Sequence, residues 1–163
     1  MRTTLALLAA LSITSLSCTA PAMAGQQVSQ GERLDAAARA RLVGDHMLTL
    51  QWLGWGDLSG AGTLVVKDEG DSLAARGEQL GTGENADDYV RVDGRIVSAT
   101  RDGFVFEGEI LTRVHHIAGG VECKRTGTFT FKATGKRKYW RLQEMQNPCD
   151  SATDYVDVYF RGI

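Results

Sequence analysis

The segment TRDGFVFEGEI, residues 100–110, decides the fold class. After the Asp102-Gly103 dipeptide, apolar and polar side chains alternate, and this period of two is typical of a strand with one buried face. Asp-Gly is also a preferred pair for a two-residue hairpin loop. The segment therefore predicts a β-hairpin with Phe104 and Phe106 on its inner face.

The same pattern extends on both sides of this hairpin. Turn dipeptides also occur at 93–94, 119–120 and 134–135, and the chain between them reads as short alternating strands. No repeat and no linker interrupts them. Short strands joined by tight turns favour a barrel or a sandwich. We expect a mainly β protein, an antiparallel up-and-down β-barrel of about eight strands, forming a single domain over residues 25–163.

One helix is expected before the strands, in SQGERLDAAARARLVG, residues 29–44. Ser29 and Glu32 have the spacing of a capping box, and Gly44 is a natural stop. The apolar stripe of this helix is narrow. A narrow stripe suits a helix packed outside the barrel, across its end or along a sheet edge.

The turns also predict which side chains face inward. If each dipeptide is a two-residue loop, Ile110 faces Phe129 across one pair of strands, and Phe129 faces Trp140 across the next. The turns were placed independently, yet they agree on one largely apolar face. Its expected members are Val97, Ala99, Phe104, Phe106, Ile110, Val114, Phe129, Phe131, Trp140 and Leu142.

The N-terminal residues 1–24 are expected to be a secretory signal peptide. Arg2 precedes a short apolar run, and a small-residue cleavage site follows, with cleavage after Ala24. Lipoprotein anchoring at Cys18 is the less favoured alternative, because Ser stands where such signals usually carry Leu. The sequence thus predicts a periplasmic or secreted protein, and no apolar run is long enough for a transmembrane segment.

Charge and cysteine content narrow the function further. Without Arg2 the net charge changes from −2 to −3, with 17 Lys and Arg against 20 Asp and Glu, so no nucleic acid is expected as a partner. In an oxidising compartment, Cys123 and Cys149 most simply form a disulfide. Two free buried thiols are the alternative.

No metal site and no cofactor are predicted. Adjacent residues on a strand point to opposite faces, so His115 and His116 would not hold one ion together. The chain also carries no catalytic motif of the GxSxG or HExxH type, and the protein is expected not to be an enzyme.

The first candidate surface lies on the last two strands, KRKYWRLQEM (136–145) and TDYVDVYFRG (153–162). Pairing them places Arg141 opposite Asp157 on the outer face. Tyr and Arg anchor many protein interfaces, although a cross-strand network that only stiffens the sheet is the alternative and is favoured. This Tyr-Arg ladder comprises Tyr139, Arg141, Gln143, Tyr155, Asp157 and Tyr159, with Arg161 at its end.

The second candidate site is polar and faces inward, at one end of the barrel. The expected register places His116 opposite Cys123 and Arg125 opposite Glu144. Polar residues at the mouth of an apolar barrel are typical of a ligand site, and an ion pair with a rim histidine is the alternative. Trp55, in the glycine-rich turn 54–62, is a candidate lid or interface anchor.

The tryptophans of WLGWG (52–56), the glycine-rich turn after them and an arginine on a late strand resemble the lipocalin and avidin type of small up-and-down barrel, a calycin-like fold. The resemblance implies an exported barrel that holds a small apolar ligand.

Two functions follow as predictions. The first is an exported, non-enzymatic barrel that binds a small amphipathic molecule at its mouth. The alternative is a module that binds an envelope protein, such as an inhibitor of a cell-envelope hydrolase, through the exposed Tyr-Arg face. A barrel interior filled by aromatic side chains would favour the alternative.

Overall fold

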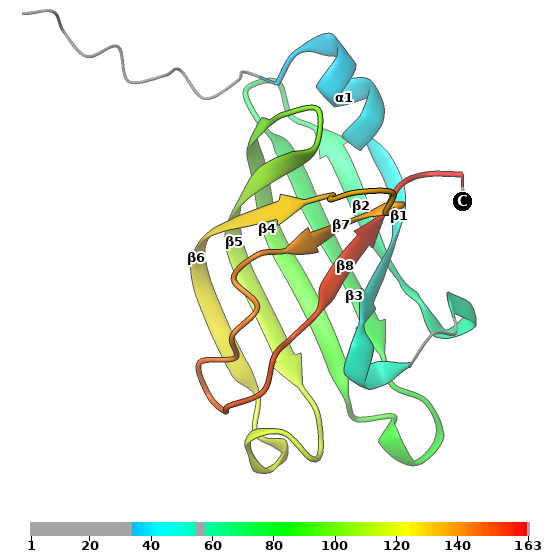
Figure 1. Ribbon diagram of the computed structural model, residues 1–163, viewed down its shortest axis with the longest axis vertical. Helices are drawn as coiled ribbons and strands as arrows, with labels where there is room; N and C mark the ends of the chain where they lie inside the picture. Colours follow the sequence, from blue (N-terminus) through cyan, green and yellow to red (C-terminus); the bar gives the residue numbers. More distant parts are fainter. Residues whose placement is uncertain (1–33, 55–57, 163) are drawn as a thin grey trace, which may run out of the picture.

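The chain forms a closed antiparallel barrel of eight strands, described for residues 34–54 and 58–162 of the computed structural model (Figure 1). The strands pair in sequence order and β8 closes on β1, which confirms the predicted fold class. The strands are β1 (Gly44–Leu50), β2 (Gly62–Asp68), β3 (Leu73–Leu80), β4 (Tyr89–Ala99), β5 (Gly103–Arg113), β6 (Cys123–Lys132), β7 (Tyr139–Leu142) and β8 (Val156–Tyr159).

The helix α1 (Ala36–Leu42) lies at one end of the barrel (Figure 1). Its N-cap is Asp35, whose carboxylate accepts a hydrogen bond from the Ala38 amide at 2.7 Å. Ala38 and Leu42 are buried, so the narrow apolar stripe covers the barrel end as expected.

The predicted boundaries of this helix need correction. The helix ends at Leu42 with Val43 as its C-cap, and Gly44 follows with a φ of +123°, so Gly44 ends the helix as predicted and is also the first residue of β1. Asp35 is the N-cap, and the helix begins at Ala36, seven residues after the start of the predicted range 29–44. The predicted capping box Ser29-Glu32 lies outside the described residues, as do the signal peptide and Cys18.

Two of the predicted registers are wrong by four residues. Ile110 pairs with Arg125 and not with Phe129. The β7 residue Leu142 pairs with Phe131, whereas the predicted alignment of Phe129 with Trp140 places Gly127 opposite Leu142. The connections are longer than two residues; that between β5 and β6 contains the short 3-10 helix η4 (Ala118–Gly120). A slip of four is even, so every side chain keeps its predicted face.

The β4–β5 hairpin differs in another way. Ala99 pairs with Phe104, and Asp102 lies in a connection that is longer than the predicted Asp-Gly loop. A β-bulge between Ile96 and Ser98 then shifts the register. The bulge leaves Val97 only half-buried and places Ile96, fully buried, in the core instead.

The inward face is otherwise as predicted, since the other nine of its ten expected members are buried. Phe104 and Phe131 stack at a centroid distance of 4.9 Å, and Phe104 meets Trp140 edge-on at 5.6 Å. Phe106 and Phe129 continue the cluster, and all five rings are between 1% and 7% exposed. Five packed rings are enough to fill a barrel of eight strands.

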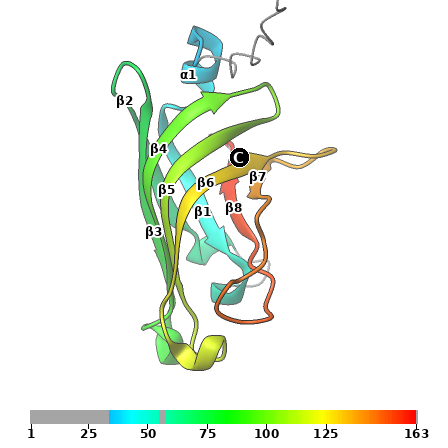
Figure 2. The ribbon, with the colours of Figure 1, turned by 90° about the vertical axis from the view of Figure 1, so that its left-hand side faces the viewer.

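Glycines allow the sheet to bend around this core. In Figure 1, β6 (yellow) runs upward and then turns a corner toward β7, and Figure 2 shows the same strand curving over the barrel. Gly127, in the middle of β6, has a φ of +156°. On the neighbouring strands, Gly94 and Gly108 pair directly, and a Cβ on either would lie 2.7 Å from the Phe106 ring.

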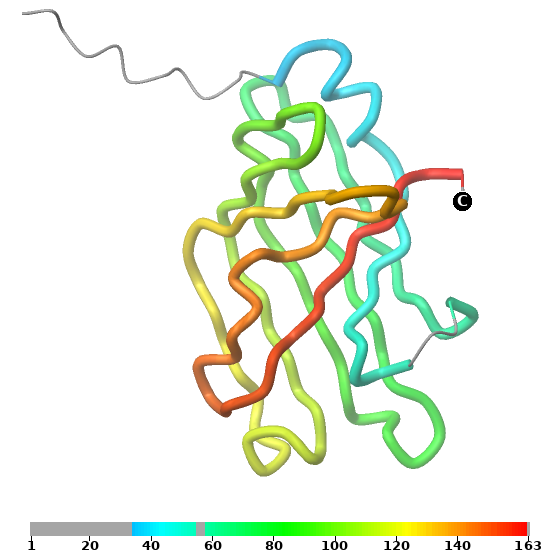
Figure 3. Tube along the Cα trace, viewed as in Figure 1, coloured from blue at the N-terminus to red at the C-terminus, as the bar shows by residue number. Residues whose placement is uncertain are grey.

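The barrel has two distinct ends, which Figure 3 separates clearly. At one end lie α1, the β4–β5 turn and the chain after β8. At the other lie the β3–β4 loop, with the 3-10 helix η3 (Gly83–Asn85), and the β5–β6 loop. The remaining 3-10 helices, η1 (Gln51–Leu53) and η2 (Leu58–Gly60), follow β1. Within the described chain, no helix is long and apolar enough to cross a membrane.

Candidate functional site

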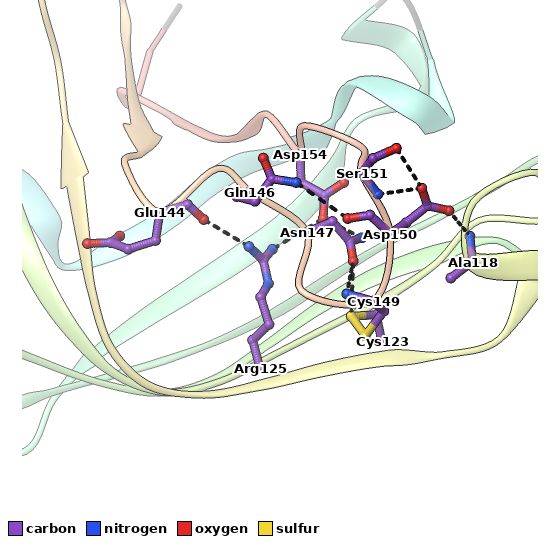
Figure 4. Close-up of a disulfide and its surroundings, with 10 residues drawn as sticks. All are labelled: Ala118, Cys123, Arg125, Glu144, Gln146, Asn147, Cys149, Asp150, Ser151 and Asp154. Atoms are coloured by element: carbon purple, nitrogen blue, oxygen red, sulfur yellow. Dashed lines mark hydrogen bonds and ion pairs between the residues drawn. A yellow bond between two sulfur atoms is a disulfide. The ribbon is translucent and has the colours of Figure 1, made fainter.

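The predicted mouth site is built around Arg125, which lies on β6 and is only 7% exposed (Figure 4). Its Nη1 donates to the main-chain carbonyl of Glu144 at 3.0 Å, and its Nη2 lies 3.5 Å from the Oδ2 of Asp154. Burial lowers the pKa of this guanidinium, and no described residue forms a hydrogen bond with its Nε or Nη2. Arg125 is thus a buried cation beneath the loop between β7 and β8.

Asp154 is the counter-charge in this loop and is 1% exposed. Trp52 Nε1 donates to its Oδ1 at 3.1 Å, and Asn147 Nδ2 donates to its Oδ2 at 3.0 Å. Burial raises the pKa of the Asp154 carboxyl, although the nearby Arg125 opposes the rise. The pair holds the loop to the sheet, and it differs from the expected ion pair because the carboxylate partner of Arg125 is Asp154 and not Glu144.

The predicted disulfide is confirmed and fixes the same loop. Cys123 and Cys149 are joined with an S–S distance of 2.06 Å. Asn147 Oδ1 accepts a hydrogen bond from the Cys149 amide at 2.8 Å, while Asp150 accepts one from the Ala118 amide at 2.6 Å (Figure 4). The loop is therefore tied to β6 and to the β5–β6 connection at once.

The other members of the predicted mouth group do not join Arg125. The Glu144 side chain is exposed and accepts from the Thr130 amide at 2.9 Å, so the expected side-chain pair between Arg125 and Glu144 is absent among the described contacts. His116 is exposed, and its ring lies 5.8 Å from Trp52. Cys123 pairs with Thr112, not with His116. Trp55 lies outside the described residues.

The two neighbouring histidines also differ from expectation. β5 ends at Arg113, so His115 and His116 belong to a turn and do not point to opposite faces of a strand. Their ring centroids are 4.6 Å apart, and His116 Nδ1 lies 3.3 Å from His115 Nε2. His115 Nδ1 lies 2.7 Å from the Oδ2 of Asp88, a carboxylate whose side chain is only 3% exposed.

The Tyr-Arg ladder is present in the predicted register. Tyr139 pairs with Tyr159 and Arg141 with Asp157, on β7 and β8. Arg141 donates through Nε and Nη2 to the two Asp157 oxygens, at 2.7 Å each. Its guanidinium also lies over the Tyr155 ring at 4.1 Å and near the Tyr139 ring at 5.2 Å. β7 ends at Leu142, so Gln143 is exposed beyond the strand.

The ladder is not the solvated face that the sequence predicts. The Arg141 side chain is 17% exposed and that of Asp157 only 7%, because the aromatic rings cover the pair. The hydrogen bonds that Arg141 donates to Asp157 raise the pKa of Arg141, whereas burial and then the Asp157 charge raise the pKa of Tyr159. Both shifts are the electrostatic signature of a bidentate ion pair held away from water.

A pocket that the sequence did not predict lies at the α1 end of the barrel. Its volume is about 330 Å³, within the range of small-ligand sites. Four separate segments form it: α1, the turn between β4 and β5, strand β7 and the chain after β8. Its lining consists of Ala40, Arg41, Arg101, Trp140, Phe160 and Arg161, and we call it the arginine pocket.

Hydrogen bonds to main-chain carbonyls fix two of its arginines. Arg41 Nη2 donates to the Thr100 carbonyl at 2.6 Å, and its Nε is buried with no hydrogen-bond partner among the described residues. Arg161 Nη2 donates to the carbonyl of Ala40. Arg101 is exposed. Within residues 34–54 and 58–162, none of the three forms an ion pair with a carboxylate.

The floor of the arginine pocket is aromatic. Trp140 and Phe160 meet at a centroid distance of 4.5 Å. Behind Trp140 lies the His46 ring at 5.7 Å, and the two nitrogens of His46 lie 2.8 Å from the carbonyls of Leu42 and Tyr159. His46 thus links the last turn of α1 to the end of β8, so the pocket floor is held on both sides.

A larger groove of about 810 Å³ lies on the outer face of β2 to β5, but its charges are already matched. Arg76 pairs with Asp93 at 2.9 Å, and Arg91 pairs with Glu78 at 3.1 Å. The groove therefore presents balanced cross-strand pairs to solvent. The arginine pocket is smaller, but its three cations have no such carboxylate partners in the part of the chain that the structure describes.

Comparison with known proteins places the chain in a family. The PM1083 family model matches residues 30–160. A relative from Pasteurella multocida (strain Pm70), "Uncharacterized protein PM1083", is 42% identical over 120 residues, which cover 74% of each chain. No solved structure matches. Since the family model spans most of the sequence and the relative covers nearly three quarters of it, the chain belongs to the PM1083 family.

Proposed function

We propose that the protein is an exported, non-enzymatic barrel that binds a small amphipathic anion in the arginine pocket. The observation that carries the proposal is the arrangement of three arginines around the aromatic floor of Trp140 and Phe160; none of the three has a carboxylate partner among the described residues. The site differs from the mouth site predicted from the sequence, which lies around Arg125 beneath the disulfide loop.

Charge argues for an anionic ligand. Guanidinium groups bind carboxylates and phosphates through paired hydrogen bonds, and the buried Nε of Arg41 lacks an acceptor among the described residues. A ligand oxyanion would supply that acceptor. Arg101 and Arg161, which reach the pocket from other segments, would add attraction over a longer range.

The aromatic floor argues for a flat apolar body. Trp140 is 4% exposed, and its ring is held between Phe104 and Phe160. A planar group stacked against such a floor gains apolar burial together with ring contacts. A pocket of about 330 Å³ suits a ligand with one or two rings rather than a long lipid.

The filled core favours a site at the barrel end. Phe104, Phe106, Phe129, Phe131 and Trp140 are all buried and pack against one another. A ligand in the middle of the barrel would have to displace them. Binding at the α1 end needs no such displacement, and export through the segment 1–24 would place this end in the cell envelope or outside the cell.

A fluorescent aromatic sulfonate, 8-anilinonaphthalene-1-sulfonate, is a suitable first probe because it combines flat rings with an anionic group. We expect saturable binding by the folded protein, and at least a tenfold weaker affinity for Arg41→Gln and for Arg161→Gln. Arg76→Gln, which removes an arginine from the outer groove, is the matched control and should bind as the unmodified protein does. Equal affinity in all four proteins would refute the site.

Native mass spectrometry of protein purified from the periplasm is the complementary experiment, because it reports a retained natural ligand by mass. An adduct that is lost in Arg41→Gln would support the proposal. Protein that carries no adduct and shows no saturable probe binding would count against a ligand-binding function.

The filled core also favours a second candidate, a protein-binding module or inhibitor of an envelope hydrolase that uses the Tyr-Arg ladder. Arg141 holds the rings of Tyr139 and Tyr155 in place, and rigid tyrosines lose little entropy on binding. In a periplasmic pull-down, Tyr155→Ala should then lose a partner that Arg76→Gln retains. Identical captured proteins for both variants would exclude the ladder.

A further inference from the structure

The end of the barrel opposite α1 carries an unusual pair of histidines, His115 and His116. The chain leaves β5 at Arg113 and turns there, so two adjacent imidazoles meet instead of diverging. His116 Nδ1 and His115 Nε2 are 3.3 Å apart. Both side chains are exposed, so solutes can reach the two nitrogens.

A buried carboxylate fixes the first of these rings. Asp88 accepts from the His115 main-chain amide at 2.8 Å through Oδ1, and its Oδ2 lies 2.7 Å from the His115 Nδ1. A carboxylate in this position accepts a hydrogen bond from the Nδ1–H group, so the lone pair of the neutral ring is on Nε2. Asp88 is fixed in turn, because the Gly81 amide donates to its carbonyl at 2.7 Å and its own amide donates to Asn85 at 2.9 Å.

We propose that His115 Nε2 and His116 Nδ1 together bind a divalent transition-metal ion such as Zn²⁺, Cu²⁺ or Ni²⁺. Two nitrogens at about 2.0–2.1 Å from a tetrahedral ion lie roughly 3.3 Å from each other, which is the separation of these two atoms. Asp88 then acts as the outer carboxylate of a carboxylate–histidine–metal arrangement, which sets the tautomer and orientation of the ligand.

The geometry also sets the kind of ion and its affinity. Imidazole nitrogens suit Zn²⁺, Cu²⁺ and Ni²⁺, whereas Ca²⁺ and Mg²⁺ prefer oxygen ligands. The described residues contain no cluster of three or more His, Cys, Asp or Glu side chains able to hold an ion, so water completes the coordination. Two protein ligands make an exchangeable site, in which Cu²⁺ should bind more tightly than Zn²⁺.

The competing explanation is a simple hydrogen bond, in which His116 Nδ1 donates to His115 Nε2. It predicts no specific metal affinity. The site is independent of the arginine pocket, because it lies at the opposite end of the barrel and shares no residue with it (Figure 3).

The test is a calorimetric titration of Zn²⁺ and Cu²⁺ into tag-free protein with its disulfide intact. We expect one saturable ion per chain, and at least a tenfold loss of affinity in His115→Ala and in His116→Ala. Asp88→Asn should weaken binding by about 10–100-fold, because an amide that donates to Nδ1 moves the ring proton to Nε2. Asp150→Asn, which alters a carboxylate of the neighbouring loop, should bind as the unmodified protein does.

A measurement on the unmodified protein avoids any folding defect that a substitution would cause. In nitrogen-detected NMR spectra of the histidine rings, Zn²⁺ should shift His115 Nε2 and His116 Nδ1, while the buried His46 serves as the internal control and stays unchanged. Unchanged ring signals for His115 and His116 at saturating Zn²⁺ would overturn the proposal. Affinity that survives in either alanine variant would also overturn it.

Discussion

Replacing Arg141 by alanine tests how the Tyr-Arg ladder stabilises the barrel. Among the described residues, the substitution leaves Asp157 without its ion-pair partner, and the Asp157 side chain is only 7% exposed. It also removes the cation from between Tyr139 and Tyr155. The sequence alone predicts an exposed pair and a small loss, whereas the observed burial predicts a large one.

The magnitude follows from the burial of the pair. An exposed ion pair contributes about 0–1 kcal/mol, while removing one partner of a buried pair costs about 3–5 kcal/mol. Arg141 is 17% exposed, so we expect Arg141→Ala to lower the free energy of unfolding by about 3 kcal/mol. For a domain of this size that corresponds to a fall of about 10 °C in Tm.

The chain offers a matched control in Arg76. It forms a cross-strand pair with Asp93 at 2.9 Å, similar to the 2.7 Å of Arg141 and Asp157, but the two side chains are 75% and 65% exposed. Arg76→Ala should therefore cost at most about 1 kcal/mol. The two ion pairs differ in burial far more than in residue type or in distance, so burial explains the difference between the two expected losses of stability.

Urea unfolding of the oxidised protein, followed by circular dichroism, gives both free energies. A second substitution, Asp157→Asn, should restore at least about 1 kcal/mol to Arg141→Ala, because it removes the uncompensated buried charge. If Arg141→Ala and Arg76→Ala cost the same, the aromatic rings do not shield the pair and the reasoning is wrong.

Three further predictions concern the disulfide, a buried carboxyl and a glycine. Cys149→Ser should lower the free energy of unfolding by about 3–4 kcal/mol, since the bond spans 26 residues, and an unchanged urea midpoint would contradict it. The pKa of Asp154 is raised in the folded state, so its stabilising contribution is present below the usual value of 3.8 and is lost as the pH rises through the raised pKa. Between these two pH values, the free energy of unfolding of the unmodified protein, relative to that of Asp154→Asn, should fall as the pH rises. A rise in this difference would refute the sign of the shift. Gly108→Ala would place a Cβ 2.4 Å from the Asp93 carbonyl and should cost more than about 2 kcal/mol, whereas Gly60→Ala has open space and should be nearly neutral in the same unfolding assay.

The sequence predicted the faces of the strands far better than their registers. The inward positions of Phe129 and Trp140 follow from a period of two, which survives any even slip. The pairing of Ile110 depends on loop length, and the sequence does not show that a 3-10 helix lengthens the β5–β6 connection. The bulge at Val97 has no sequence signal of its own.

The alternation of apolar and polar residues along the sequence could not predict the arginine pocket. Arg41 lies on α1, Arg101 lies in a turn and Arg161 follows the last strand. Nothing in the local pattern brings three such segments together, because closure of β8 on β1 produces the neighbourhood. The histidine pair was missed for a related reason, since a strand was assumed to continue past Arg113.

The filled core has a consequence for how the two proposed sites relate. Between the arginine pocket and the histidine pair lies a barrel packed with buried aromatic rings, and no described residue belongs to both sites. Sites that share no partners usually contribute independently. Zn²⁺ should therefore leave the affinity of the sulfonate probe for the arginine pocket unchanged, and Arg41→Gln should leave Zn²⁺ affinity unchanged. A change in either affinity that exceeds about twofold would mean that the barrel transmits strain between its ends. Such coupling between two binding sites is reciprocal.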